Sequence, residues 1–180
     1  MVARLTDALA RSILDPSAGL TLTIDHLIDW EPLGFQGSGL GVHTSIPILS
    51  EIREPLALRI RIMSSTPWSS HYLLIWGTRL TGCVNLRRLD LRDDHRNPDG
   101  AEVWTARTHK HTWSESHADC MAYTPTDIPH DPDLTVGVDE YRQVFEAFCA
   151  ECYVALGPSY RWTEPSLPGR GGGESLWVDP

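Results

Sequence analysis

The apolar positions near the start of the chain recur with the spacing of a helix. They lie three or four residues apart, which places them on one face of a helical segment. The dipeptide Asp15-Pro16 ends this pattern, because proline disfavours a helical conformation in the residue before it. The sequence therefore predicts a short amphipathic helix over residues 2–14. Its apolar positions are Val2, Leu5, Leu9 and Ile13.

From Gly19 onward the hydrophobic period changes to two, which is typical of half-buried strands. The clearest alternation runs from Leu56 to Met63, where Arg59 and Arg61 take the wetter face. The dipeptides of Asn97–Gly100 favour a tight turn. We expect a loop over residues 30–41 and further strands at residues 20–24, 72–76, 83–91, 101–113 and 118–123.

The period returns to 3.6 in the last third of the chain and predicts the most regular helix, with Asp139 as its N-cap. Beyond Gly157 the chain is rich in proline and glycine, so residues 158–180 are expected to form a mobile or loosely docked tail after a single domain of residues 1–157. The apolar stripe of the helix consists of Tyr141, Val144, Phe145, Phe148, Cys149, Cys152, Tyr153 and Leu156.

The order of these elements defines the fold class. Helix, several strands, helix and tail follow one another without the strand–helix alternation that a parallel sheet requires. We therefore predict an α+β protein in which an antiparallel sheet of about five to seven strands carries an N-terminal and a C-terminal helix packed on it.

Composition narrows the classes of function. A net charge of −9 over 180 residues argues against sequence-independent binding to duplex DNA, which depends on many cations. The charged N-terminal residues do not form a secretory signal, and no apolar run reaches the length of a membrane span, so a cytoplasmic location without membrane contact is expected. Four cysteines without repeating spacing predict reduced thiols.

The densest chemical signal is the segment from Thr108 to His117. If it stays extended, His109, His111 and Glu115 project from one face, because strand side chains alternate. Two imidazoles about 7 Å apart at their Cα atoms could then share one metal ion or one phosphate.

The first interpretation of this segment is metal-independent phosphodiester cleavage, as in a ribonuclease with a toxin or defence role. His95, His109 and His111 would exchange protons. The supporting residues would be Arg88 for phosphate binding, Asp90 for orientation of a neighbour and Glu115 for tuning of an imidazole. Substrate contacts are expected from Arg96, Asn97, Lys110, Trp113 and Tyr123.

The second interpretation is a mononuclear metalloprotein with Zn or Fe as cofactor, because imidazole and carboxylate suit these metals. The ligands would be His109, His111, Glu115 and His117, or His95 in place of His117. The spacing His-x-His-x3-Glu is similar to the first metal motif of the cupins. The glycines of that motif are missing here and its downstream histidine is not recognisable, which argues against a cupin.

Two interpretations without catalysis stay open beside these. The histidines can form a polar strand face that satisfies local backbone groups. Alternatively, the acidic surface can bind a basic protein partner, as an antitoxin-like or anti-defence module does. The sequence leaves the oligomeric state open.

Several short motifs between residues 56 and 150 resemble a family of uncharacterised bacterial proteins often found among mobile-element genes. The resemblance implies a site in this region without implying a reaction. The chain has Trp113 where this family is expected to have tyrosine after the second histidine. The motifs are Arg88-Leu89-Asp90, His95-x-Asn97-Pro98-Asp99-Gly100, His109-x-His111 and Ala122-Tyr123.

Overall fold

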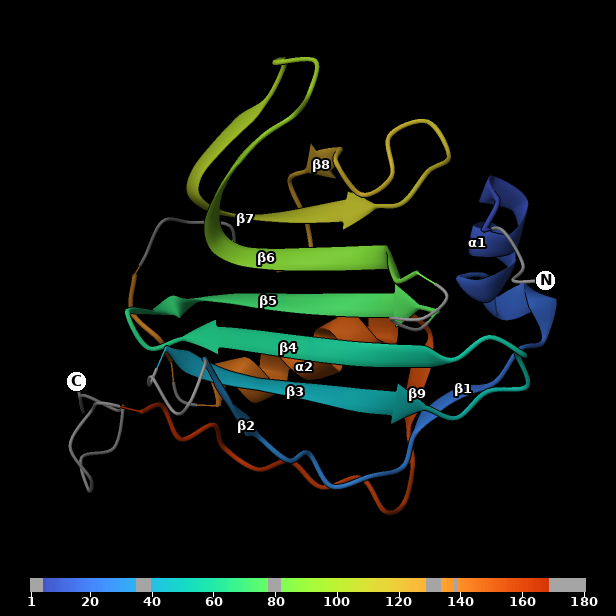
Figure 1. Ribbon diagram of the computed structural model, residues 1–180, viewed down its shortest axis with the longest axis horizontal. Coiled ribbons are helices and arrows are strands. Elements are labelled where there is room, and N and C mark those ends of the chain that lie inside the picture. Colours follow the sequence, from blue (N-terminus) through green and yellow to red (C-terminus); the bar gives the residue numbers. More distant parts are fainter. Residues whose placement is uncertain (1–4, 35–39, 78–81, 129–133, 138, 169–180) are drawn as a thin grey trace.

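Seven antiparallel strands form one sheet, in which every strand lies beside its neighbour in sequence (Figure 1). The computed structural model describes residues 5–34, 40–77, 82–128, 134–137 and 139–168. This arrangement, a β-meander, confirms the predicted antiparallel α+β class. Its seven strands equal the largest number that was expected for the sheet. The strands are β2 (Glu31–Leu33), β3 (Gly41–Ile48), β4 (Leu56–Met63), β5 (Thr66–Trp76), β6 (Val84–Arg96), β7 (Val103–Thr112) and β8 (Ala122–Tyr123).

A second, smaller pairing joins the two ends of the described chain. Strand β1 (Leu22–Ile24) runs parallel to β9 (Val154–Leu156), with Leu22 opposite Val154. The sequence pattern extended the last helix to Leu156, and this prediction was wrong. The helix ends at Glu151, Tyr153 takes a left-handed conformation with φ 55°, and the strand begins at Val154.

In chain order, helix α1 (Asp7–Ile13) and a short 3-10 turn come before the seven-stranded sheet. Helix α2 (Glu140–Glu151) comes after it. Thr6 caps α1, because its Oγ1 accepts a hydrogen bond from the Leu9 backbone N–H. Asp139 precedes α2 as predicted, but it lies in a left-handed conformation and its side chain makes no capping hydrogen bond. Val2, at the start of the predicted first helix, lies outside the described residues.

Besides β9, two strands of the sheet were not predicted. Strand β3 occupies residues 41–48, where buried and more exposed side chains alternate from Val42 onward. Pro47 is compatible with this position because β2 pairs only with residues 41–43, so no N–H of residue 47 is needed on that edge. Strand β2 lies inside the expected loop of residues 30–41, of which residues 35–39 are outside the described part of the chain.

The apolar core lies between one face of the sheet and α2, which crosses behind β3–β5 in Figure 1. The ring centroids of Tyr72 on β5 and Phe148 on α2 are 6.2 Å apart. The Tyr141 hydroxyl donates a 2.6 Å hydrogen bond to the Pro67 carbonyl. Because these polar groups find partners inside the core, the helix has a fixed position along β5.

The hairpin formed by β6 and β7 bends sharply, and its far half curves past β7 at the edge of the sheet (Figure 1). The strand register shifts twice between Asp90 and His95. Arg92 and Ala106 take left-handed conformations with φ 45° and 48°, which non-glycine residues rarely adopt. Such irregularities increase twist and bend a hairpin. The far half of the hairpin therefore covers part of the near half.

The described part of the C-terminal segment, residues 158–168, contacts the rest of the protein. Trp30 Nε1 donates a 2.8 Å hydrogen bond to the Thr163 carbonyl, and the Tyr160 ring stacks on Phe145. Leu167 is 7% exposed. No helix in the described ranges combines the length and the apolar character that crossing a membrane requires.

Candidate functional site

A carboxylate without solvent exposure, Asp90, lies at the centre of a cluster of basic side chains. Arg88 contacts both of its oxygens, with Nε 2.9 Å from Oδ1 and a terminal nitrogen 2.5 Å from Oδ2. From β5, His71 Nδ1 lies 2.8 Å from Oδ1. The strand register explains the assembly, because His71, Asp90 and His109 are direct cross-strand neighbours.

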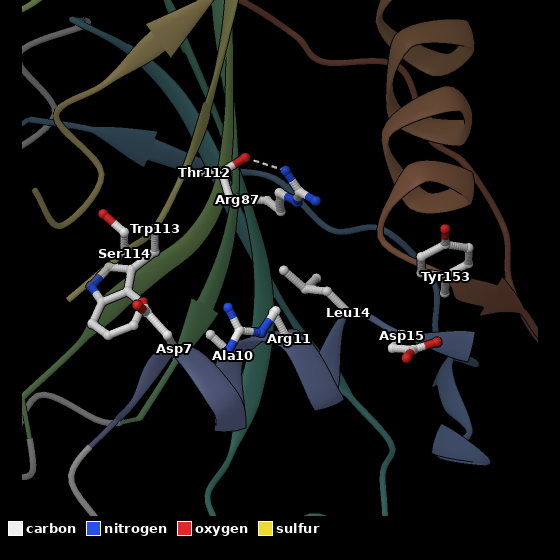
Figure 2. A pocket seen from close by; sticks show the side chains of 10 residues that line it. All are labelled: Asp7, Ala10, Arg11, Leu14, Asp15, Arg87, Thr112, Trp113, Ser114 and Tyr153. Atoms are coloured by element: carbon white, nitrogen blue, oxygen red, sulfur yellow. Dashed lines mark hydrogen bonds between the residues drawn. The ribbon is translucent and has the colours of Figure 1, made fainter. Parts of the chain in front are cut away.

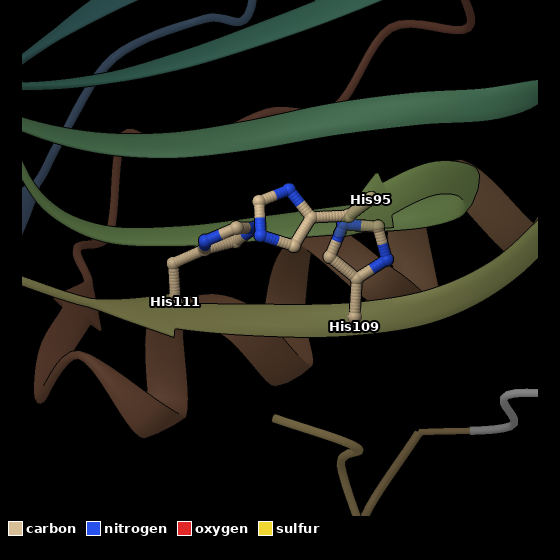
Figure 3. A group of neighbouring side chains, drawn as sticks. All are labelled: His95, His109 and His111. Atoms are coloured by element: carbon tan, nitrogen blue, oxygen red, sulfur yellow. The ribbon is translucent and has the colours of Figure 1, made fainter. Parts of the chain in front are cut away.

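Three imidazoles converge beside one another (Figure 3), and two of them, His109 and His111, lie against Asp90 Oδ2. His109 and His111 come from β7 and are fully buried, and His95 comes from the folded-back part of β6. The centroid of the His95 ring lies 5.3 Å from that of His109 and 4.6 Å from that of His111. Each histidine offers a ring nitrogen within 4.8 Å of the others.

Hydrogen bonds orient two of these rings. His109 Nδ1 lies 2.9 Å from the Arg107 carbonyl, which can only accept, so Nδ1 carries a proton and Nε2 is the nitrogen that faces Asp90. His95 Nε2 lies 3.0 Å from the Cys120 carbonyl and 3.2 Å from Asn97 Oδ1, so it is the donor and Nδ1 is free. These contacts select the tautomer of each ring.

Several buried polar atoms face one another without hydrogen bonds. Asp90 Oδ2 lies 3.2 Å from His109 Nε2 and 3.4 Å from His111 Nε2. Among the residues that the structure describes, none of these three atoms, nor His111 Nδ1, has a hydrogen-bond partner. Each buried polar atom without a partner costs about 1–3 kcal/mol, so the cluster is incomplete without a further proton or ion.

The electrostatics favour an ionised carboxylate beside a neutral imidazole. Burial raises the pKa of Asp90, but its interactions with His109, His111, His71 and Arg88 lower it by more, so the pKa lies well below its usual range. Burial, followed by the proximity of His111, lowers the pKa of His95. The free ring nitrogen of His95 is therefore available as an acceptor or ligand at neutral pH.

A second group shares Asp90 on its solvent side. His71 is 20% exposed, and its Nε2 lies 3.6 Å from Asp93 Oδ2. Together these three residues also place ligand-type atoms within 4.8 Å. Because His71 Nδ1 is already hydrogen bonded to Asp90, this group orients the carboxylate from outside.

Glu115 and His117 are not brought to the cluster. Strand β7 ends at Thr112, and Ser114 forms an isolated bridge with Ala118, so the segment turns instead of staying extended. Glu115 accepts a hydrogen bond from the backbone of Asp7, and His117 bonds to a neighbouring serine. The assumption that the whole segment is a single strand was wrong.

Lys110 and Tyr123 face the opposite side of the sheet from the imidazoles. Lys110 is 3% exposed and pairs with Asp127 at 2.7 Å and with Glu151. Tyr123, opposite Lys110 in the register, approaches Glu151 with its hydroxyl at 3.4 Å. The alternation of strand side chains explains why neither residue joins His109 or His111.

The other predicted substrate contacts lie in three different places. Asn97 is buried and hydrogen bonded to both the N–H and the carbonyl of Ala122, so it holds the folded-back hairpin against β8. Arg96 is exposed at the end of β6. Trp113 packs against the edge of the core, beside α1.

Two residues of the site were missed from the sequence. His71 belongs to a strand whose register with β6 could not be inferred, although its place beside the inward-facing Tyr72 indicated an outward face. Trp104 covers the cluster from the folded-back strand, with its ring centroid 5.5 Å from that of His109. Only the bend of the hairpin brings it there.

Comparison with known proteins identifies one similarity. Residues 74–154 match the model of a family of unknown function, DUF6978. The matched segment contains Arg88, Asp90, His95, His109 and His111 and begins just after His71. No curated protein matches the chain. No solved structure matches it either. An uncharacterised domain is thus shown for this segment, whereas the bacterial and mobile-element associations remain predictions.

Proposed function

We propose that the chain is a metal-binding protein that holds one transition-metal ion, best fitted by Zn, among His95, His109, His111 and Asp90. The observation that carries the proposal is the convergence of buried nitrogen and oxygen atoms that have no hydrogen-bond partner. An ion at this point would give every one of them a partner except a single nitrogen of His111.

The two distances from Asp90 to the imidazoles of β7 fit tetrahedral coordination. With Zn–N distances of 2.0–2.1 Å, two ligands of a tetrahedral ion lie about 3.3 Å apart. The contacts from Asp90 Oδ2 to Nε2 of His109 and His111 are 3.2 and 3.4 Å. The bonds from His109 to Arg107 and from His95 to Cys120 supply the outer contacts that usually orient metal-binding imidazoles.

The burial of the ligands favours a structural role for the ion. His109 and His111 are fully buried, and Asp90, which lies against both, would add a carboxylate to the three-histidine group as a fourth ligand. Four protein ligands would leave no open position for water or substrate, as in structural zinc sites. His95 lies on the far side of the hairpin bend, so the ion would tie the folded-back half of β6 to the near half of β7.

Metal binding can be measured directly. The purified chain is stripped with a chelator, and zinc is then titrated by calorimetry and quantified by elemental analysis. We expect one ion per chain, and His95→Ala should weaken binding by about 100-fold or more, beyond the 10–100-fold typical of residues outside the first coordination sphere.

His117→Ala is the matched control, because it removes an exposed imidazole from the loop beside β7. This variant and Glu115→Ala should bind zinc like the unmodified chain. Absence of bound metal in the unmodified chain, or loss of binding in the His117 variant, contradicts the proposal.

Phosphodiester hydrolysis is the second candidate, and the open face of the sheet favours it. Arg59 and Arg61 on β4 lie across β5 from the site, with Arg61 opposite His71. Neither guanidinium is hydrogen bonded or ion paired within the described residues. Guanidiniums without partners beside a histidine cluster suit a phosphate backbone.

RNA cleavage separates the two candidates. Mixed RNA is incubated with the zinc-loaded chain, the chelated chain and the His95→Ala variant, with His117→Ala as control. Cleavage that requires His95 supports the second candidate, and intact RNA in every reaction removes it without affecting the metal proposal. The acidic interaction module stays a separate prediction.

A further inference from the structure

A cavity of about 530 Å³ lies between α1 and the ends of β6 and β7 (Figure 2). Its volume falls within the range of small-molecule sites. Arg87 lines it, whereas Arg88, the next residue, contacts Asp90. Successive strand residues point to opposite faces, so this cavity is separate from the histidine cluster.

Two guanidiniums in the cavity have unused donors. Arg87 donates one hydrogen bond to the Thr112 hydroxyl, and its buried Nε has no partner among the described residues. The side chain of Arg11, from α1, is not hydrogen bonded or ion paired within the described part of the chain. A guanidinium has five N–H donors, so the pair can bind several oxygens of one ligand.

The two carboxylates in the wall already have their own donors. Asp7 Oδ1 accepts a 2.8 Å hydrogen bond from the Glu115 backbone, and Asp15 Oδ1 accepts bonds of 2.8 and 2.6 Å from Ser17. In Figure 2 they lie toward the two sides, and the guanidiniums of Arg11 and Arg87 lie between them. Both carboxylates are thus already hydrogen bonded, whereas the two guanidiniums keep donors for a ligand.

Aromatic side chains flank the two guanidiniums. Trp113 lies on one side and Tyr153, which is 50% exposed, on the other (Figure 2). Aromatic walls pack against planar apolar groups, and paired guanidiniums recognise phosphate oxygens in a bidentate manner. We propose that this cavity binds a small phosphate monoester carried on a planar ring system, with Arg11 and Arg87 on the phosphate.

Adenosine 5′-monophosphate is a suitable probe, with inorganic phosphate and adenosine as the two halves of its chemistry. Calorimetry should show tighter binding of the monophosphate than of either half. Arg11→Gln and Arg87→Gln should each weaken this binding about tenfold or more, the loss expected for a charge-assisted pair.

Arg142→Gln is the matched control, because Arg142 is exposed on α2 and pairs with Glu146 on its own helix. It should leave binding unchanged, and so should His95→Ala, which tests the metal site. Arg11 is exposed, so its variant remains informative even if Arg87→Gln fails to fold. Equal binding of adenosine and its monophosphate, or unchanged binding by Arg11→Gln, overturns the proposal.

Discussion

Strand β7 has two buried charged systems on its opposite faces, and they differ in completeness. On the helix side, Lys110 is enclosed by Asp127 and Glu151, and its ammonium group meets two carboxylates. On the other side, His109 and His111 face Asp90 with atoms that lack hydrogen-bond partners. The first system needs nothing further, whereas the second has the features of a binding site.

Removing the metal should produce the largest change. An ion present at about 1,000 times its Kd stabilises the fold by about 4 kcal/mol. For a chain of this size that corresponds to about 8–16 °C in Tm. A thermal melt of the chelated chain, followed by a melt after zinc is restored, measures this difference. An unchanged Tm would mean that the cluster of His109, His111 and Asp90 needs no metal, just as Lys110 and its two carboxylates need none.

Removing the two carboxylates that pair with Lys110 should lower the free energy of unfolding almost as much, but this loss should not depend on metal. Asp127→Asn combined with Glu151→Gln leaves a buried ammonium unpaired, which should destabilise the fold by about 3 kcal/mol, the lower end of the range because Asp127 is half exposed. Urea unfolding measures the loss, and zinc affinity should not change. Glu146→Gln, in an exposed pair, is the control and should cost less than about 0.5 kcal/mol.

The pH dependence of this pair has a defined sign. Burial raises the pKa of Asp127, but the hydrogen bond from Lys110 lowers it by more. A lowered folded-state pKa gives a stabilising contribution that is present above the unfolded pKa of about 3.9 and is lost as the pH falls below it. The double variant should therefore approach the stability of the unmodified chain only in acid.

Releasing the folded-back hairpin should lower the stability by a smaller amount, and it should affect the histidine cluster but not the Lys110 pair. Asn97→Ala removes two hydrogen bonds to Ala122 and should cost about 2 kcal/mol. Because Asn97 also contacts His95, zinc affinity should fall about tenfold. Asn85→Ala, near the other end of β6 and bonded to Asp119, is the control for calorimetry and should leave the affinity unchanged. Equal zinc affinities in the two variants would mean that the position of the hairpin does not affect the metal site.

Zinc should have no effect on the thiols. Cys149 and Cys152 are buried, which raises the pKa of each thiol, whereas Cys83 and Cys120 are exposed. A thiol reagent at pH 8 should label two cysteines in the folded chain and four after unfolding, with or without zinc. If zinc protects Cys83 or Cys120 from labelling, the metal binds at a thiol and the proposed site at the imidazoles is wrong.

Local patterns predicted the elements whose contacts are local. The alternation of Leu56–Met63 predicted β4, and the residues of Asn97–Gly100 predicted the hairpin turn. Arg88 and Asp90 are two residues apart on β6 and form an ion pair, as the alternation of strand side chains allows. The position of His71 depended on a register between strands, which no local pattern specifies.

At the end of β7, too, the local sequence pattern was not enough to predict the structure of the site. Nothing in the residues from Thr108 to His117 distinguishes a long strand from a strand that turns at Ser114, so Glu115 was placed with the imidazoles. His95 was included correctly in the cluster, since its nitrogen lies near those of His109 and His111. Its route there, through two register shifts, depends on tertiary contacts.

The parallel contact of β1 with β9 sets an order in which the chain can fold. Neighbouring hairpins of β4–β7 close through short loops, whereas β1 must wait for a segment at the other end of the chain, and such distant closure is slow. We expect pulse-labelled hydrogen exchange to protect the amides of the meander first and those of β1 and β9 last. Simultaneous protection would mean that the two ends meet before the sheet has formed.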